Sequence, residues 1–107
     1  MTDYILIITT VGSQEEAQII ANQLVTKRLV ACVNSLPGIH STYRWRGKVC
    51  EDEEIMMLIK TKTAFEKRVY QVVKSLHSYD LPEVITLPIA NGDEPYFKWL
   101  NDSLSKT

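Results

Sequence analysis

Cysteine, histidine and glycine are scarce in this 107-residue chain, and their scarcity excludes several classes of protein. The chain has two cysteines, two histidines and four glycines. Cys32 and Cys50 are too few for a disulfide framework and lack the spacing of a zinc knuckle. The sequence contains no H-x-x-x-H, no C-x-x-C and no Gly-rich phosphate loop. Zinc-stapled domains and disulfide-rich secreted mini-domains are therefore excluded.

Basic charge in excess and long apolar runs are also missing. Twelve Lys and Arg stand against thirteen Asp and Glu, whereas a nucleic-acid-binding domain is usually strongly basic. The apolar run Ile55–Ile59 is far short of the ~18–20 residues that a membrane span needs. The opening Met-Thr-Asp-Tyr has neither the basic start nor the cleavage site of a signal peptide. We expect a cytoplasmic protein with no nucleic-acid and no membrane partner.

The sequence shows no recognisable catalytic motif. No nucleophile elbow occurs, and two histidines leave no convincing Ser-His-Asp set. Hydrophobic residues make up 45% and charged residues 23% of the chain, which is ordinary for a folded domain. We expect residues 1–107 to form a single domain that is not an enzyme.

Apolar periodicity predicts the order β-α-β-β-α-β with a further helix at the end. Ser13 with Glu16, and Thr63 with Glu66, have the spacing of capping boxes that begin helices. Two βαβ units with right-handed crossovers give an α+β fold, the ferredoxin-like split βαβ sandwich. The predicted strands cover Tyr4–Val11, Leu29 to about Tyr43, Val49–Thr61 and Val84–Ile89.

The second and third strands form a hairpin that is too long for the domain. Residues 30–43 would span roughly 45 Å if extended, whereas a domain of this size is only about 34 Å across. The hairpin must bend at Pro37-Gly38, project from its domain, or both. A projecting ribbon leaves open edges that neighbouring copies would cover. We therefore expect a homo-oligomer.

Metal-ligating side chains are few. His77, at the predicted end of the second helix, is either a cation that interacts with the helix dipole or an imidazole ligand for copper, zinc or nickel. Strand alternation splits the acidic run Glu51–Glu54 between two faces, which favours a solvated edge over a hard-cation site. Glu54 borders the apolar run and could pair with Lys60.

Many segments together resemble the CutA divalent-cation-tolerance family, in order along essentially the whole chain. They are Leu29-Val30-Ala31-Cys32-Val33-Asn34, Pro37-Gly38-Ile39, Tyr43-Arg44-Trp45-Arg46-Gly47-Lys48, Glu54, Leu58-Ile59-Lys60-Thr61, His77-Ser78-Tyr79-Asp80-Leu81-Pro82-Glu83, Leu87-Pro88-Ile89, Gly92 and Tyr96-Phe97-Lys98-Trp99-Leu100. The resemblance implies a ferredoxin-like fold in a homotrimer whose long hairpins pack against neighbouring subunits. It also implies tolerance of divalent cations, with copper(II) or another divalent cation as the bound metal.

The copper ligands ascribed to bacterial members are a cysteine in the first strand and two adjacent histidines at the end of the second helix. Carried over by the resemblance, these positions hold Thr9, Leu76 and His77 here. Only His77 keeps a family ligand.

Two other functions remain open. By analogy with other ferredoxin-like trimers, the protein could be a small-molecule-binding signalling protein with ligand clefts between subunits. The candidate cleft residues are Glu54, Lys60, Tyr79, Glu83, Trp45 and Trp99. Alternatively, the trimer is a non-catalytic scaffold without a ligand.

Overall fold

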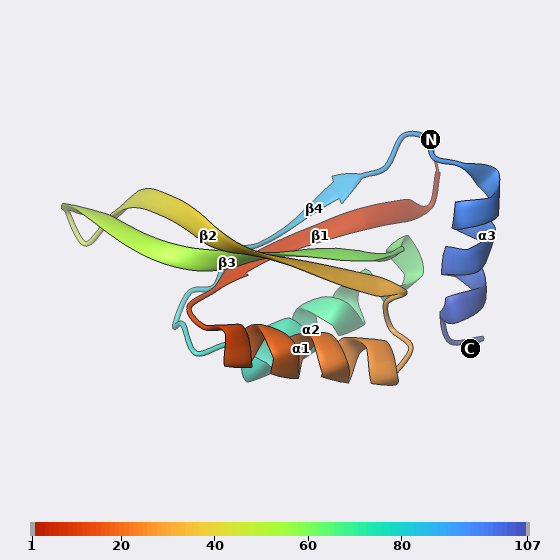
Figure 1. Ribbon diagram of the computed structural model, residues 1–107, viewed down its shortest axis with the longest axis horizontal. Coiled ribbons are helices and arrows are strands. Elements are labelled where there is room, and N and C mark those ends of the chain that lie inside the picture. Colours follow the sequence, from red (N-terminus) through yellow and green to blue (C-terminus); the bar gives the residue numbers. More distant parts are fainter. Residues whose placement is uncertain (1, 107) are drawn as a thin grey trace.

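The computed structural model describes residues 2–106 and shows a four-stranded antiparallel sheet with two helices on one face (Figure 1). In chain order the elements are β1 (Tyr4–Val11), α1 (Gln14–Thr26), β2 (Cys32–Trp45), β3 (Lys48–Lys62), the short 3-10 helix η1 (Thr63–Phe65), α2 (Glu66–Leu76), β4 (Val84–Pro88) and α3 (Glu94–Ser103). The strand order is β2-β3-β1-β4. This is the predicted ferredoxin-like arrangement. Among the described residues, none of the helices is long and apolar enough to cross a membrane.

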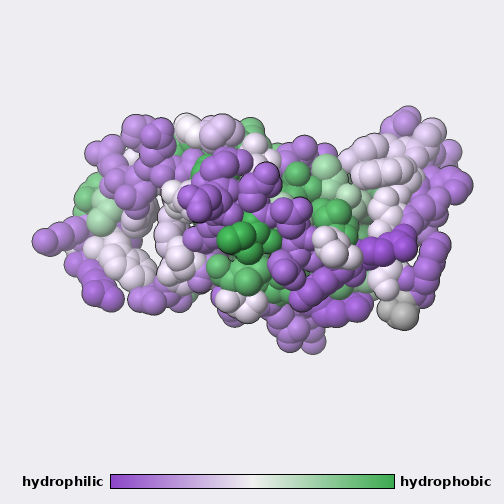
Figure 2. Space-filling view, turned by 60° about the horizontal axis from the view of Figure 1, so that its bottom comes forward, coloured by the Kyte–Doolittle hydropathy of each residue, from purple (hydrophilic) through white to green (hydrophobic). Residues whose placement is uncertain are grey.

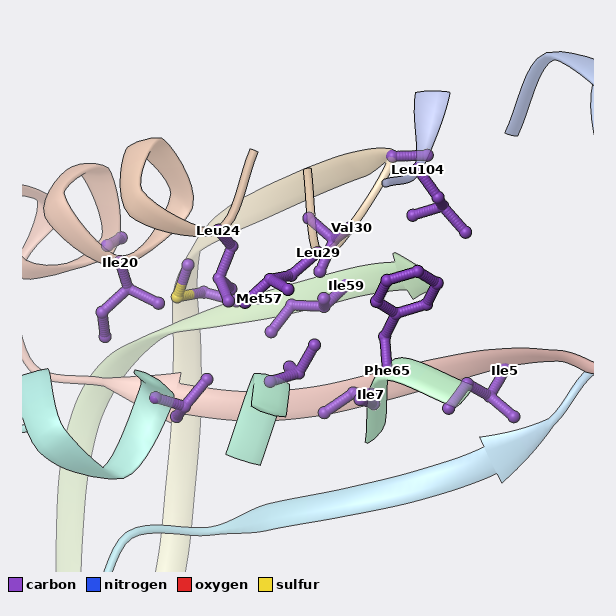
Figure 3. Packing of buried hydrophobic residues seen from close by; sticks show 14 of the residues in the cluster. Ile5, Ile7, Ile20, Leu24, Leu29, Val30, Met57, Ile59, Phe65 and Leu104 are labelled. Carbon is purple, nitrogen blue, oxygen red and sulfur yellow. The ribbon is translucent and has the colours of Figure 1, made fainter. Parts of the chain in front are cut away.

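The core lies between the sheet and the helices α1 and α2. Alternate side chains of the two central strands point toward the helices, as in Ile7, Met57 and Ile59, which are all fully buried. Ile20 and Leu24 of α1 pack onto them (Figure 3). Burying an aliphatic side chain of this size contributes roughly 1.5–3 kcal/mol, so this layer holds the domain together.

The opposite face of the sheet, which we call the open face, carries apolar side chains that no helix covers over most of its length (Figure 1). Directly paired residues of neighbouring strands share a face. The open face is made of Leu6, Ile8, Met56, Leu58, Ile85 and Leu87. Ile85 and Leu87 remain 48% and 42% exposed. By contrast, the helical side is hydrophilic over most of its surface, with smaller apolar areas near the middle (Figure 2).

The hairpin of β2 and β3 both bends and projects, as its length requires. β1 pairs with β3 only as far as Ile55, so residues 39–54 extend beyond the domain as a two-stranded arm (Figure 1). The ladder shifts register between Leu36 and Ile39, where Gly38 has a φ of 76°. The molecule measures 45 × 26 × 22 Å. The predicted bend at Pro37-Gly38 is confirmed.

The two predicted capping boxes turn out differently. Ser13 Oγ accepts the backbone N–H of Glu16 at 3.2 Å, so α1 has its predicted N-cap. The Glu16 carboxylate does not complete the box, because it accepts the backbone N–H of Ser78 instead. The prediction of the second capping box is wrong, because Thr63 begins η1 and its hydroxyl donates to the carbonyl of Asp3. Helix α2 then begins at Glu66 without a side-chain cap.

Candidate metal and ligand sites

His77 follows the last residue of α2, and its side chain is completely buried. Its Nε2 lies 2.8 Å from the carbonyl oxygen of Thr10, and its Nδ1 accepts the backbone N–H of Tyr79 at 3.1 Å. A carbonyl can only accept, so Nε2 carries the proton and the ring is the neutral Nε2–H tautomer. His77 therefore fastens the segment after α2 to the end of β1. A metal could bind either nitrogen only after one of these hydrogen bonds broke.

The carboxylate of Glu16 lies next to His77. Its Oε2 lies 3.4 Å from His77 Nδ1 and also accepts the N–H of Ser78. An imidazole nitrogen and a carboxylate oxygen are thus adjacent, a donor pair that suits Cu(II). Within residues 2–106 no group of three or more His, Cys, Asp or Glu side chains is arranged to hold a metal. His77 and Glu16 therefore place two potential donor atoms side by side, which is fewer than a complete coordination shell needs.

The other two positions of the family copper pattern provide no ligand. Thr9 is fully buried on the helix-facing side of β1, and its hydroxyl has no hydrogen-bond partner among the described residues. Leu76 is apolar and 37% exposed. Of the three positions, only His77 carries a side chain that binds metals well.

A groove of about 950 Å³ lies between the arm and the loop Tyr79–Glu83 that follows α2. Glu54 lines it and is only 7% exposed. Tyr79 Oη donates to Glu54 Oε2 at 2.8 Å. Burial, and then this hydrogen bond, raise the pKa of Tyr79, so its phenol stays protonated and remains a donor at neutral pH. Trp45 and Glu83 line the same groove.

A second tyrosine–carboxylate pair lies further along the arm. Tyr43 donates its phenol proton to Asp52 Oδ2, and both residues line the groove. The hydrogen bond to Asp52, with a smaller contribution from burial, raises the pKa of Tyr43 to about 12. Sequence reasoning missed this pair, although the hairpin register that places Tyr43 opposite Cys50 also brings it diagonally across from Asp52.

The remaining candidate cleft residues lie elsewhere in the chain. Lys60 Nζ contacts Tyr96 Oη at 3.5 Å and lies 5.7 Å from the centre of that ring. Trp99 packs against Tyr96 with the ring centroids 5.5 Å apart. The predicted pair between Glu54 and Lys60 is wrong, because six residues of extended strand separate them by roughly 20 Å. The structure thus groups Glu54, Tyr79, Glu83 and Trp45 in the groove. Lys60 and Trp99 lie apart from them, each in contact with Tyr96 of α3.

The comparison with protein families assigns the chain. Residues 5–103 match the model described as CutA1 divalent ion tolerance protein. The chain belongs to the CutA1 family. A divalent-cation tolerance protein CutA of Thermus thermophilus is 46% identical over 92% of this chain and 95% of that protein. One of Pectobacterium atrosepticum is 41% identical over 97% of this chain and 94% of that protein.

Solved CutA structures share the fold closely. The Thermus thermophilus protein superimposes with a TM-score of 0.92 at 44% identity, over 95% of this chain and 99% of that chain. The CutA structure from Xylella fastidiosa gives a TM-score of 0.94 at 39% identity, over 97% of this chain and all of that one. Likeness of this extent confirms the CutA assignment made from the sequence motifs. The family is named for tolerance of divalent ions and not for catalysis.

Proposed function

We propose that this CutA protein acts in divalent-cation tolerance as a cytoplasmic, non-catalytic homotrimer that binds a divalent metal, with copper(II) as the first candidate. Membership of the divalent ion tolerance family supports the cation. The observation that carries the proposal is the adjacent imidazole and carboxylate of His77 and Glu16, whose atoms lie 3.4 Å apart.

The open face and the arm support the homotrimer. Six apolar side chains lie on the open face, and Ile85 and Leu87 are nearly half exposed. Apolar surface of this kind is ordinarily covered in a stable protein. The arm has only two strands and is marginal by itself in water. Packing with two further copies would cover the face and brace the arm.

The donor set at His77 supports copper(II) more than a hard cation. Neutral imidazole and carboxylate together suit Cu(II), whereas Mg²⁺ and Ca²⁺ prefer oxygen ligands alone. The bound form requires that the Tyr79 N–H leave Nδ1, because this nitrogen faces Glu16. Water or groups of another protomer then complete the coordination shell.

A competition titration tests the metal proposal. Cu(II) affinity is measured against a chelator of known affinity for the untagged wild type, His77→Ala, Glu16→Gln and His40→Ala. His40, the other histidine, lies on the arm and is the matched control. We expect His77→Ala to weaken binding at least tenfold, Glu16→Gln to weaken it less, and His40→Ala to leave it unchanged. Equal affinity in all four proteins would contradict a site at His77.

Small-molecule binding is the second candidate function, and the groove favours it. Its volume of about 950 Å³ and its aromatic walls, with carboxylates beside them that can orient a ligand, are typical of ligand sites. In a trimer, Lys60 and Trp99 of a neighbouring copy could complete the cleft. A thermal-shift screen separates this function from a scaffold without a ligand, because a specific ligand raises the melting temperature of the protein that binds it.

A further inference from the structure

Asn91 is directly followed by Gly92 in the segment 89–93, which joins β4 to α3. The segment has no regular secondary structure, and both residues are exposed. It lies at the end of the sheet opposite the arm (Figure 1). Because glycine has no side chain, the backbone nitrogen of Gly92 is not shielded from the side chain that precedes it.

The segment is held at its two ends and not between them. The backbone N–H of Ile89 donates to the carbonyl of Tyr4 at 3.0 Å, and the carbonyl of Asp93 accepts a backbone hydrogen bond of α3 at 3.0 Å. Within residues 2–106, neither Asn91 nor Gly92 makes a hydrogen bond. The side-chain amide of Asn91 can therefore turn toward the nitrogen of Gly92 without breaking an existing contact.

These two groups can react with each other in water. The Gly92 nitrogen loses its proton to solvent base and attacks Cγ of Asn91. A C–N bond forms, and the side-chain nitrogen takes a proton from water and leaves as ammonia, which produces a five-membered succinimide. Water then opens the ring. Opening at Cγ gives aspartate, whereas opening at the backbone carbonyl gives isoaspartate, whose main chain is one atom longer; both add a negative charge.

The other three asparagines lie in regular structure and are not followed by glycine. They are Asn22 in α1, Asn34 in β2 and Asn101 in α3. The side-chain oxygen of Asn101 also accepts a hydrogen bond from Lys62 Nζ at 3.0 Å. Backbone in a helix or strand must open locally before the next nitrogen can reach the side chain. These three residues are therefore internal controls for Asn91.

Isoaspartate at position 91 would disturb the start of α3. The backbone of Gly92 lies so close to this helix that a Cβ there would be 2.4 Å from Phe97 Cζ. Phe97 in turn stacks on Tyr4 with the ring centroids 4.1 Å apart. A longer main chain next to Gly92 has to displace it or its neighbours. Aspartate adds only a charge ahead of the helix N-terminus, where the helix dipole favours it.

We propose that Asn91-Gly92 is a modification site at which the folded protein deamidates spontaneously, and that the isoaspartyl product loosens the start of α3. The reaction consumes only water. It is separate from the His77–Glu16 pair and does not depend on a bound metal.

Incubation of the full chain at mildly alkaline pH, in the assembly state that light scattering shows, tests the site. Mass spectrometry of peptides measures the exchange of amide for carboxylate at each asparagine, and labelling by an isoaspartyl methyltransferase measures isoaspartate. We expect Asn91 to react at least about tenfold faster than each of the other three. Asn91→Gln is the matched control, because glutamine would need a less favourable six-membered ring. A rate at Asn91 no greater than at the other asparagines would overturn the proposal.

Melting temperatures test the consequence for α3. Aged wild type is compared with equally aged Asn91→Gln, which undergoes every other change of the incubation. We expect the aged wild type, once mostly isoaspartyl, to melt at least about 4 °C lower. Fresh Asn91→Asp, which adds the charge without lengthening the main chain, should melt within about 1 °C of fresh wild type. Equal melting of the two aged proteins would overturn the effect on α3.

Discussion

Replacing Tyr79 by Phe removes the one hydrogen bond that the buried Glu54 carboxylate accepts within residues 2–106. The ring is kept, so its packing against His77 can persist. The variant leaves a carboxylate that is 7% exposed without a donor. We expect it to be less stable than the wild type at neutral pH.

The size of the effect follows from the burial of the two partners. A hydrogen bond to a charged group contributes about 1.5–3 kcal/mol to stability. Tyr79 is 36% exposed, so water can partly replace the lost donor. The lower end, about 1.5 kcal/mol, is therefore expected. In a domain of this size that corresponds to a fall of roughly 6–12 °C in melting temperature.

Thermal and urea unfolding at one fixed protomer concentration measure the change, because assembly makes stability depend on concentration. Tyr96→Phe is the matched control: its ring is similarly exposed, and its hydroxyl makes only a 3.5 Å contact with Lys60. We expect the control to lose less than about 0.5 kcal/mol. If Tyr79→Phe also lost less than this, the carboxylate of Glu54 would be solvated and the account of the groove would be refuted.

Three further predictions concern the arm, α3 and assembly. The folded-state pKa of Tyr43 is raised from 10.0 to about 12, so its hydrogen bond stabilises the protein fully below about pH 10 and is lost as the pH rises through about 12. In an ultraviolet titration, Asp52→Asn should lower the pKa of one tyrosine toward 10. Gly92→Ala places a Cβ 2.4 Å from Phe97 Cζ, so it should destabilise the protein by about 1–3 kcal/mol in urea unfolding, and a loss below about 0.5 kcal/mol would contradict that contact. Light scattering of the wild type should give a molecular mass of three times 12.2 kDa. Leu58→Asp on the open face should lower this mass, and an unchanged mass would show that the open face is not the interface.

Much of the fold was predictable because local patterns and tertiary packing agree. The continuous apolar run Ile5–Ile8 with the β-branched residues after it predicted a strand, and the structure has one at Tyr4–Val11. Ser13 accepts the predicted N-cap hydrogen bond. The excess length of the hairpin predicted its projection, and Pro37-Gly38 marked its bend. Each of these features depends on neighbouring residues or on simple lengths.

The contacts at the candidate sites were not predictable in the same way. His77 meets Thr10 across 67 positions of sequence, and Glu16 meets Ser78 across 62. No local pattern specifies such pairings, because they depend on how the segment after α2 crosses the end of β1. For this reason the capping-box interpretation of Glu16 was only half correct. The position of Glu54 at the edge of an apolar run did signal its burial, but not its partner Tyr79.

The proposed divalent-cation site at His77 can be tested by electron paramagnetic resonance of the untagged His40→Ala protein loaded with one Cu(II) per protomer. In this variant His77 is the one remaining imidazole, because the sequence contains two histidines. If His77 binds the metal, the spectrum shows spin-echo modulation from the remote nitrogen of a coordinated imidazole, and this modulation is absent when His77 is also replaced by Ala. A spectrum of oxygen ligands alone, identical in the two proteins, would contradict it.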